Sequence, residues 1–195
     1  MKTLYIERSC GGGRDGSWTE QLDLEGVERI VVGTGPGSFA GIRAALAFAQ
    51  GYALGRPCEV LGLPSPCAVA AQFYLSNGKS ILKGVRPFLD GRNGKLAVVG
   101  DARRGKIWIA LFDGYSLVRD VFQVDSDDLL GSVPSECPVV TVDEARIGEK
   151  LKATFGERYL GGQTPTAEGL QTFAEANPAM LVREPLPIYL NPAVR

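Results

Sequence analysis

The 195-residue chain has the composition of an ordinary globular protein, with 45% hydrophobic and 22% charged residues and a formal net charge of −1. This length and apolar content suffice for a sizeable buried core, and the near-zero charge argues against a surface that wraps nucleic acid. The chain contains no histidine, which excludes a Ser-His-Asp or Cys-His catalytic arrangement and any histidine-ligated metal within it.

The four cysteines are dispersed, and none belongs to a Cys-x-x-Cys pair. We interpret them as reduced structural thiols and expect no metal site. No run of about 20 apolar residues is free of Arg, Gln or Gly, and the first residues lead directly into a strand instead of a signal peptide. We therefore expect a cytoplasmic protein that does not contact membranes.

The chain opens with a predicted strand over residues 3–7. The glycines at 11–13 favour a flexible hairpin over a phosphate cradle. A second strand is predicted over residues 17–22, and a charged linker then leads to residue 28.

A β-branched run at residues 29–32 predicts a buried strand, and closely spaced glycines at 33–37 predict a tight turn after it. Ser38 is placed to cap a helix that begins at Phe39. Gly55 supplies a left-handed stop, so the helix is expected to end at Leu54.

This helix has only two strongly polar residues, Arg43 and Gln50, so it is either central to the core or covered by a partner. Small residues recur every four positions and form a ridge that lets another element come close. Two alternatives stay open: the ridge packs within the chain, or part of it meets a second subunit. The ridge residues are Gly41, Ala45, Ala49 and Ala53.

The glycine turn precedes a helix N-terminus, where backbone N–H groups can receive a phosphate. The alternative is a plain strand-to-helix turn. Pro36 removes one donor, and no Gly-Lys-Ser/Thr follows as it would in a Walker sequence. These features favour the plain turn.

Strands and helices alternate through the rest of the chain, which indicates α/β lobes. Turn residues at 90–94 suggest a lobe boundary, giving an N-terminal lobe of residues 1–94 and a C-terminal lobe of residues 95–195. The expected strands are 59–63, 95–100, 106–112, 117–124 and 138–142, and the expected helices are 67–75, 144–155 and 166–177.

Residues 95–112 are predicted to form a hairpin with a four- or five-residue loop at 101–105. This loop carries Asp101, Arg103 and Arg104. Two arginines can grip a carboxylate or phosphate through bidentate hydrogen bonds, and they can equally belong to a solvated turn.

Residues 35–43, Gly-Pro-Gly-Ser-Phe-Ala-Gly-Ile-Arg, resemble the signature of the bacterial TsaB (YeaZ) family, with Ala40 where Thr is usual. Residues 101–108 are similar to the family's Asp-Ala-Arg-x-Gly-Glu-Val-Tyr hairpin. Residues 187–190 look like its Pro-x-Tyr-Leu-Arg ending, with Asn191 where Arg is usual. Three matches occur in the right order over most of the chain.

The resemblance implies an α/β, two-lobed actin/sugar kinase/Hsp70-like (ASKHA) fold. The first lobe is trimmed, because the family normally carries a further helix before the central motif. It also implies a non-catalytic scaffold without a cofactor of its own. Family members pair with the metal-bearing catalytic subunit TsaD and the ATPase TsaE in threonylcarbamoylation of the adenosine next to the tRNA anticodon.

The chain would then meet tRNA only through the complex, and it would form a homodimer when isolated. The expected partner-binding residues lie in the glycine turn and the helix after it. They are Gly35, Pro36, Gly37, Ser38, Phe39, Gly41, Ile42, Arg43, Ala45 and Ala49.

In this fold the first strand ends beside nucleotide phosphates, and the resemblance places the 101–105 loop toward the cleft. It thus suggests Ser9, Asp101, Arg103 and Arg104 as nucleotide or anion contacts. Glu7 stands where an Asp is usual, and it moves the carboxylate outward by a methylene.

Three rival functions remain. The first is an ATP-dependent small-molecule kinase of the same fold, for which Glu7 is a poor replacement for the phosphate-binding Asp. The second is a peptidase, suggested by the naming of relatives as glycoproteases, although no nucleophile has a histidine base here. The third is a diverged homodimeric interaction protein.

Overall fold

The computed structural model describes residues 1–10, 16–79 and 94–190. The predicted glycine hairpin at 11–13 and the turn at 90–93 lie outside these ranges. The chain divides into two compact units. Unit 1 comprises Met1–Ala68 and Pro165–Ile188, and unit 2 comprises Val69–Thr164 and Tyr189–Arg195. The predicted boundary at residue 94 thus falls inside unit 2, the first boundary follows Ala68, and the segment Pro165–Ile188 belongs to unit 1.

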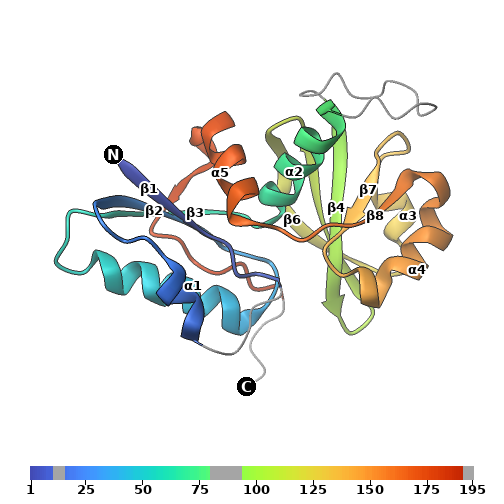
Figure 1. The fold of residues 1–195 in the computed structure, drawn as a ribbon. Coiled ribbons are helices and arrows are strands. Elements are labelled where there is room, and N and C mark those ends of the chain that lie inside the picture. Colours follow the sequence, from blue (N-terminus) through green and yellow to red (C-terminus); the bar gives the residue numbers. More distant parts are fainter. Residues whose placement is uncertain (11–15, 80–93, 191–195) are drawn as a thin grey trace. The chain divides into compact units, whose positions relative to one another are not determined.

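Unit 1 is built on a four-stranded sheet with the order β1-β2-β3-β9 (Figure 1). The first three strands are parallel, and β9 is antiparallel to β3. The strands are β1 (Lys2–Ile6), β2 (Val27–Gly33), β3 (Glu59–Leu63) and β9 (Val182–Arg183); the helices are η1 (Gly16–Gln21), α1 (Phe39–Ala53), α5 (Ala167–Ala176) and η3 (Pro178–Met180).

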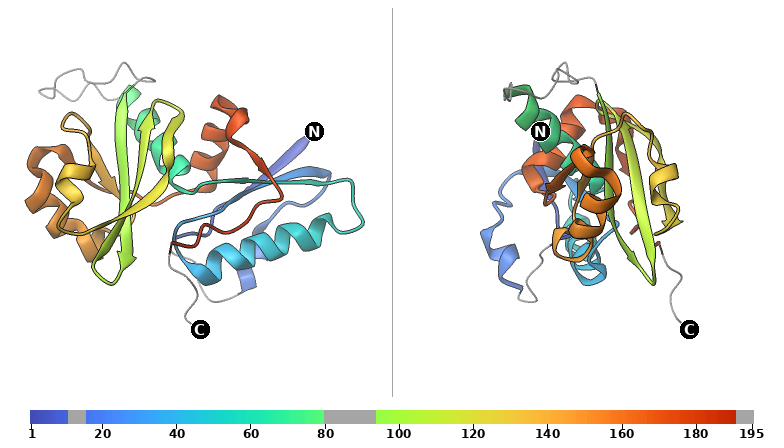
Figure 2. Two further views of the ribbon diagram at one scale, coloured as in Figure 1. Left: turned by 180° about the vertical axis from the view of Figure 1, so that it is seen from behind. Right: turned by 90° about the vertical axis from the view of Figure 1, so that its right-hand side faces the viewer.

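Helices cover both faces of this sheet, with α1 on one side and α5 on the other (Figures 1 and 2). The β-branched run in β2 explains why, because both faces of the strand are apolar. Ile30 and Val32 pack with α1 in one core cluster, and Val31 is buried as well. The parallel strands end at one edge, which brings their carboxyl ends together.

The predicted strand over residues 17–22 is wrong, since these residues form the 3-10 helix η1. The reason is tertiary: β1 pairs directly with β2, so the connecting segment runs outside the sheet. Trp18 in η1 packs edge-on against Phe48 of α1, with the ring centroids 5.4 Å apart. Aromatic packing therefore decides the conformation here, not strand propensity.

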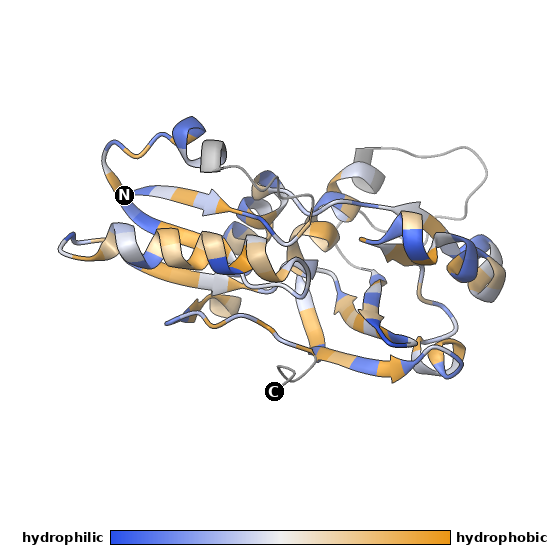
Figure 3. Cartoon of the chain, turned by 90° about the horizontal axis from the view of Figure 1, so that it is seen from below, coloured by the Kyte–Doolittle hydropathy of each residue, from blue (hydrophilic) through white to orange (hydrophobic). Residues whose placement is uncertain are grey.

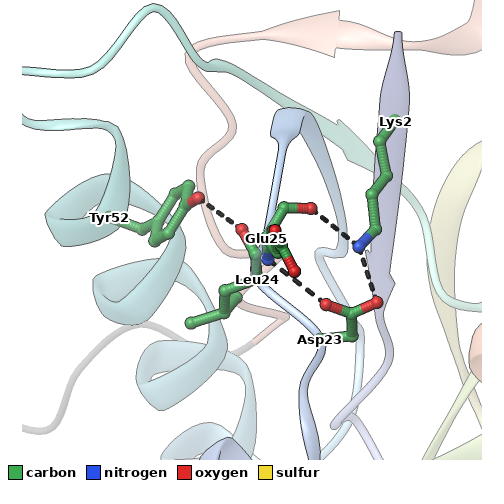
Figure 4. Close-up of polar contacts among 5 residues, drawn as sticks. All are labelled: Lys2, Asp23, Leu24, Glu25 and Tyr52. Atoms are coloured by element: carbon green, nitrogen blue, oxygen red, sulfur yellow. Dashed lines mark hydrogen bonds and ion pairs between the residues drawn. The ribbon is translucent and has the colours of Figure 1, made fainter.

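Polar contacts fix the segment between η1 and β2 (Figure 4). The Lys2 ammonium donates to the Asp23 carboxylate at 2.6 Å and to the Glu25 carbonyl at 2.8 Å. The Tyr52 hydroxyl of α1 donates to the Leu24 carbonyl at 2.9 Å. One short linker is thus tied to both β1 and α1.

Unit 2 contains a five-stranded sheet with the order β6-β5-β4-β7-β8. An antiparallel meander is followed by two strands that run parallel to β4. The predicted hairpin, the later strands and the helix predicted over residues 144–155 are confirmed here, and the helix predicted over residues 166–177 is α5 of unit 1. The elements are β4 (Lys95–Arg103), β5 (Lys106–Asp113), β6 (Ser116–Asp125), α3 (Leu129–Ser132), β7 (Val139–Thr141), α4 (Glu144–Phe155), η2 (Gly156–Arg158) and β8 (Tyr159–Gly162).

The helix α2 (Pro66–Lys79) begins in unit 1 and continues in unit 2, and it runs past the predicted end at Leu75. Within unit 2, the Tyr74 hydroxyl on α2 donates to the Gly94 carbonyl at 2.7 Å. Among the residues the structure describes, no helix is long and apolar enough to cross a membrane.

Candidate functional site

The glycine turn joins the carboxyl ends of β2 and β3. The Thr34 N–H donates to the Leu63 carbonyl at 2.9 Å. The Gly35 N–H donates to the Ser65 hydroxyl at 3.0 Å, and the Ser65 N–H returns a hydrogen bond to the Gly35 carbonyl at 2.9 Å. Gly35 has a φ of 90°, which only glycine adopts readily, and the peptide to Pro36 is cis. The turn is therefore held against the end of β3 and the residues that follow it.

The helix after the turn starts as predicted, with Ser38 as its N-cap accepting from the Gly41 N–H at 3.3 Å. The segment that follows β1 lies across this helix start. Its Ser9 carbonyl accepts from the Ser38 N–H at 2.6 Å, and an ideal Cβ on Gly41 would lie 2.1 Å from the Arg8 carbonyl oxygen. Oxygens of the chain itself thus accept from two of the N–H groups that a phosphate would use, those of Ser38 and Gly41. This favours the plain turn over phosphate binding.

Ser9 itself is buried, with 2% of its surface exposed. Its hydroxyl has no hydrogen-bond partner among the described residues. Gly37 allows the close approach, because an ideal Cβ there would lie 2.3 Å from the Ser9 carbonyl oxygen. The predicted anion contact by Ser9 is therefore not supported, because its side chain does not face solvent.

Glu7 is the residue whose placement the sequence did not reveal. Its Oε1 accepts from the Ser9 N–H at 2.7 Å, and its Oε2 is buried without a hydrogen-bond partner in the described part of the chain. Burial raises the pKa of the Glu7 carboxyl, and the hydrogen bond from the Ser9 N–H acts in the opposite direction. The carboxylate thus turns inward, although its position suggested a group beside phosphates.

The small-residue ridge on α1 faces the core of unit 1. Ala45 and Ala49 have no exposed surface and pack with Ile42 against the sheet. The intramolecular alternative therefore holds at these positions, and the prediction that Ala45, Ala49 and Ile42 contact a partner is wrong for their side chains. Gly35 and Pro36 are buried too.

The opposite face of α1 is exposed, and the hydropathy colouring of this helix in Figure 3 is mostly white to orange. Phe39 and Leu54 at its two ends are 56% and 79% exposed, and the Arg43 guanidinium lies 4.9 Å above the Phe39 ring. Between the ends the residues are small, apart from one arginine and one glutamine. The exposed residues of this outward face are Phe39, Ala40, Arg43, Ala44, Ala47, Gln50, Gly51 and Leu54.

In unit 2, Asp101 is engaged within the unit. Its N–H donates to the Asp143 carboxylate at 2.9 Å, and its Oδ1 accepts from the Arg103 N–H at 2.8 Å. Its Oδ2 forms ion pairs with Arg103 at 3.2 Å and with Arg146 at 3.5 Å. Asp101 is thus paired with Arg103 and with Arg146 of α4, and the anion contact expected of this loop stays a prediction.

The hairpin turn is tighter than predicted, because β4 and β5 continue to Arg103 and Lys106 and leave two residues between them. Arg103, Arg104 and Gly105 have φ values of 67°, 53° and 75°. Both arginines are exposed. No ion pair holds Arg104 within the described ranges, so this side chain is a solvated turn residue here. Among the described residues no group of three or more Cys, Asp or Glu is arranged to hold a metal ion.

Comparisons with known proteins extend these observations. The family model described as "TsaD: tRNA N6-adenosine threonylcarbamoyltransferase" matches residues 19–123. A solved structure described as an uncharacterized protein with similarity to peptidase YEAZ, from Pseudomonas aeruginosa, is 20% identical with a TM-score of 0.63, covering 90% of this chain and 79% of that one. YeaZ from Pseudomonas aeruginosa is 21% identical, also with a TM-score of 0.63, covering 88% of this chain and 79% of that one. A search of curated proteins finds no match. These likenesses confirm the fold class and the resemblance given by the sequence motifs.

Proposed function

The chain belongs to the TsaD family of tRNA N6-adenosine threonylcarbamoyltransferases, because the family model matches more than half of it. From this premise we propose that the chain serves threonylcarbamoylation of tRNA as a non-catalytic scaffold. In this role it pairs with a TsaD-type catalytic subunit and works with a TsaE-type ATPase. It reaches tRNA only through the complex, because its net charge is −1.

The observation that carries this proposal is the outward face of α1. Exposed alanines and a glycine leave the helix backbone open to close approach, and Phe39 and Leu54 offer apolar contacts at the two ends. This face begins at the motif that resembles the TsaB (YeaZ) signature. We therefore assign the pairing surface to Ala40, Ala44, Ala47 and Gly51 in place of the buried ridge.

Several features support a non-catalytic role. The chain has no histidine to ligate a metal or act as a base. Two N–H groups at the start of α1, those of Ser38 and Gly41, already have acceptors, and Glu7 faces inward. A kinase of the same fold needs a carboxylate and N–H groups that are open to nucleotide, so these features disfavour that alternative.

The test compares two neighbouring substitutions on α1. Ala44→Arg places a charge on the exposed face, so it should abolish co-purification with the host's TsaD while the thermal unfolding midpoint stays unchanged. Ala45→Arg buries a charge in the core, so it should unfold unit 1. Ala176→Arg on the exposed part of α5 is the matched control and should bind TsaD as the wild type does.

Sizing of the complex with TsaD and TsaE, with and without ATP, completes the experiment. A one-to-one pair with TsaD that Ala44→Arg disrupts supports the proposal. If the chain self-associates and does not bind TsaD, and Ala44→Arg disrupts the self-association, the outward face of α1 is a homodimer interface. That result would rule out the scaffold role. Binding of TsaD by Ala44→Arg at wild-type strength would rule out this surface.

A further inference from the structure

The Glu7 carboxyl lies where three segments of unit 1 meet. It follows the end of β1, and its Oε2 lies so close to the end of β2 that an ideal Cβ on Gly33 would be 1.9 Å away. The same Cβ would lie 2.8 Å from the Ser65 hydroxyl, which follows β3. The carboxyl thus fills a space that only a glycine at position 33 leaves open.

A series of hydrogen bonds leads from this carboxyl to the start of α1. Glu7 Oε1 accepts from the Ser9 N–H at 2.7 Å, and the Ser9 carbonyl accepts from the Ser38 N–H at 2.6 Å. Ser38 in turn caps the helix at Gly41. On the other side, Ser65 holds Gly35 at 3.0 Å. Glu7 therefore contacts groups that fix both ends of the glycine turn.

Among the residues that the structure describes, none forms an ion pair with Glu7. The nearby Cys67 thiol on α2 is fully buried, and burial raises its pKa well above the ordinary value, which keeps it neutral. Arg8 has its guanidinium 5.0 Å above the Trp18 ring. The strand ends contribute Gly33 and Ser65, which carry no charge. These surroundings favour the neutral carboxylic acid.

We propose that Glu7 is a positioning residue that holds the glycine turn and the first turn of α1 in the geometry required for pairing. The proposal rests on the proposed function, because the outward face of α1 begins at this turn. Glu7 acts through Ser9 and Ser38 and contacts no ligand. Glu7 is thus a brace between strand ends, although the resemblance places the end of the first strand beside nucleotide phosphates.

Side-chain length and charge make different demands on this brace. Gln has the same length, accepts from the Ser9 N–H through its oxygen and is neutral, so Glu7→Gln should preserve the turn. Asp is one methylene shorter and cannot reach the same positions, so Glu7→Asp should loosen it. Glu7→Ala removes the acceptor altogether. The exposed Glu28, also in unit 1, gives the control Glu28→Gln.

The experiment measures amide hydrogen exchange of residues 34–42 in the isolated chain. Glu7→Ala and Glu7→Asp should lose about tenfold in protection, the effect of one buried hydrogen bond. Glu7→Gln and Glu28→Gln should match the wild type. After correction for intrinsic exchange, wild-type protection should fall as pH rises, because ionisation opposes burial of the carboxyl, and Glu7→Gln should remove this dependence.

Affinity for the host's TsaD is measured on the same variants and should fall in parallel with protection. Unchanged exchange of residues 34–42 in Glu7→Asp and Glu7→Ala would overturn the proposal, as would a wild-type pH profile in Glu7→Gln. If Glu7→Ala fails to fold, Glu7→Asp and the pH profiles of the wild type and Glu7→Gln still test the proposal. If the exchange pattern is as expected but the chain does not bind TsaD, the positioning role of Glu7 is supported and the proposed scaffold function is ruled out.

Discussion

Gly33→Ala tests the packing at the end of β2 most directly. Gly33 does not have a left-handed φ, so its backbone accepts alanine. The obstacle is the Glu7 carboxyl: the new Cβ would lie 1.9 Å from Oε2 and 2.6 Å from Cδ. It would also lie 2.8 Å from the Ser65 hydroxyl. We therefore expect Gly33→Ala to expel the Glu7 side chain from its site.

The size of the effect follows from this geometry. Oε2 must retreat by about 1.1 Å to reach 3.0 Å, below which real Cβ contacts essentially never fall. Overpacking of this kind costs about 1–3 kcal/mol, and loss of the Ser9 N–H hydrogen bond costs a similar amount. Because one movement causes both losses, we expect a total of about 3 kcal/mol and a fall in the unfolding midpoint of about 6–12 °C.

Urea unfolding of four proteins measures the coupling: wild type, Gly33→Ala, Glu7→Ala and the double variant. Truncation of Glu7 empties the space that the new methyl group needs, so Gly33→Ala should cost about 1–3 kcal/mol less in the Glu7→Ala background. Equal costs in both backgrounds, or a cost below about 0.5 kcal/mol in the wild type, would show that Glu7 does not fill this site and would refute the reasoning.

Three further predictions concern unit 2. The Lys95 ammonium lowers the pKa of Glu136 to about 2, so this ion pair stabilises the fold above the ordinary Glu pKa, and the stabilisation is lost as pH falls toward about 2. Glu136→Gln should remove this part of the pH dependence of stability, as measured by urea unfolding. The change should be small because both groups are exposed. Burial raises the pKa of Cys137 to about 11, so a thiol reagent at neutral pH should label Cys58 long before Cys137, as peptide mass spectrometry can measure. Arg104→Asn should raise stability by about 0.5–1 kcal/mol in thermal unfolding, because asparagine tolerates the positive φ of the turn better than arginine.

Local chemistry predicted the central elements of the fold correctly. The strand before the glycine turn, the Ser38 cap and the helix from Phe39 are all observed, and the helix ends at Ala53 with Leu54 as its C-cap. Each depends on signals within a few residues: β-branched side chains, a capping hydroxyl and a glycine stop. The segment that became η1 lacks such signals, and the contact between Trp18 and Phe48 joins residues far apart in the sequence.

The direction in which α1 faces was harder to predict, because two sets of small residues both recur at helical spacing. One set includes Ala45 and Ala49, and the other includes Ala44 and Ala47. The larger side chain Ile42 decides between them, since it is buried and turns the first set toward the sheet. The same reasoning moves the proposed pairing surface to the second set, which a search for a regular four-residue ridge overlooks.

The glycines of the motif suggest a phosphate cradle when they are considered by themselves. In the structure, an ideal Cβ on Gly33, Gly37 or Gly41 would lie within 2.3 Å of the segment after β1. The contact would be with Glu7 at Gly33, with Ser9 at Gly37 and with Arg8 at Gly41. The missing side chains of the three glycines therefore allow residues 7–9 to pack against the end of β2 and the start of α1. A glycine-rich turn before a helix indicates close approach of some backbone or ligand, and here the group that approaches is residues 7–9.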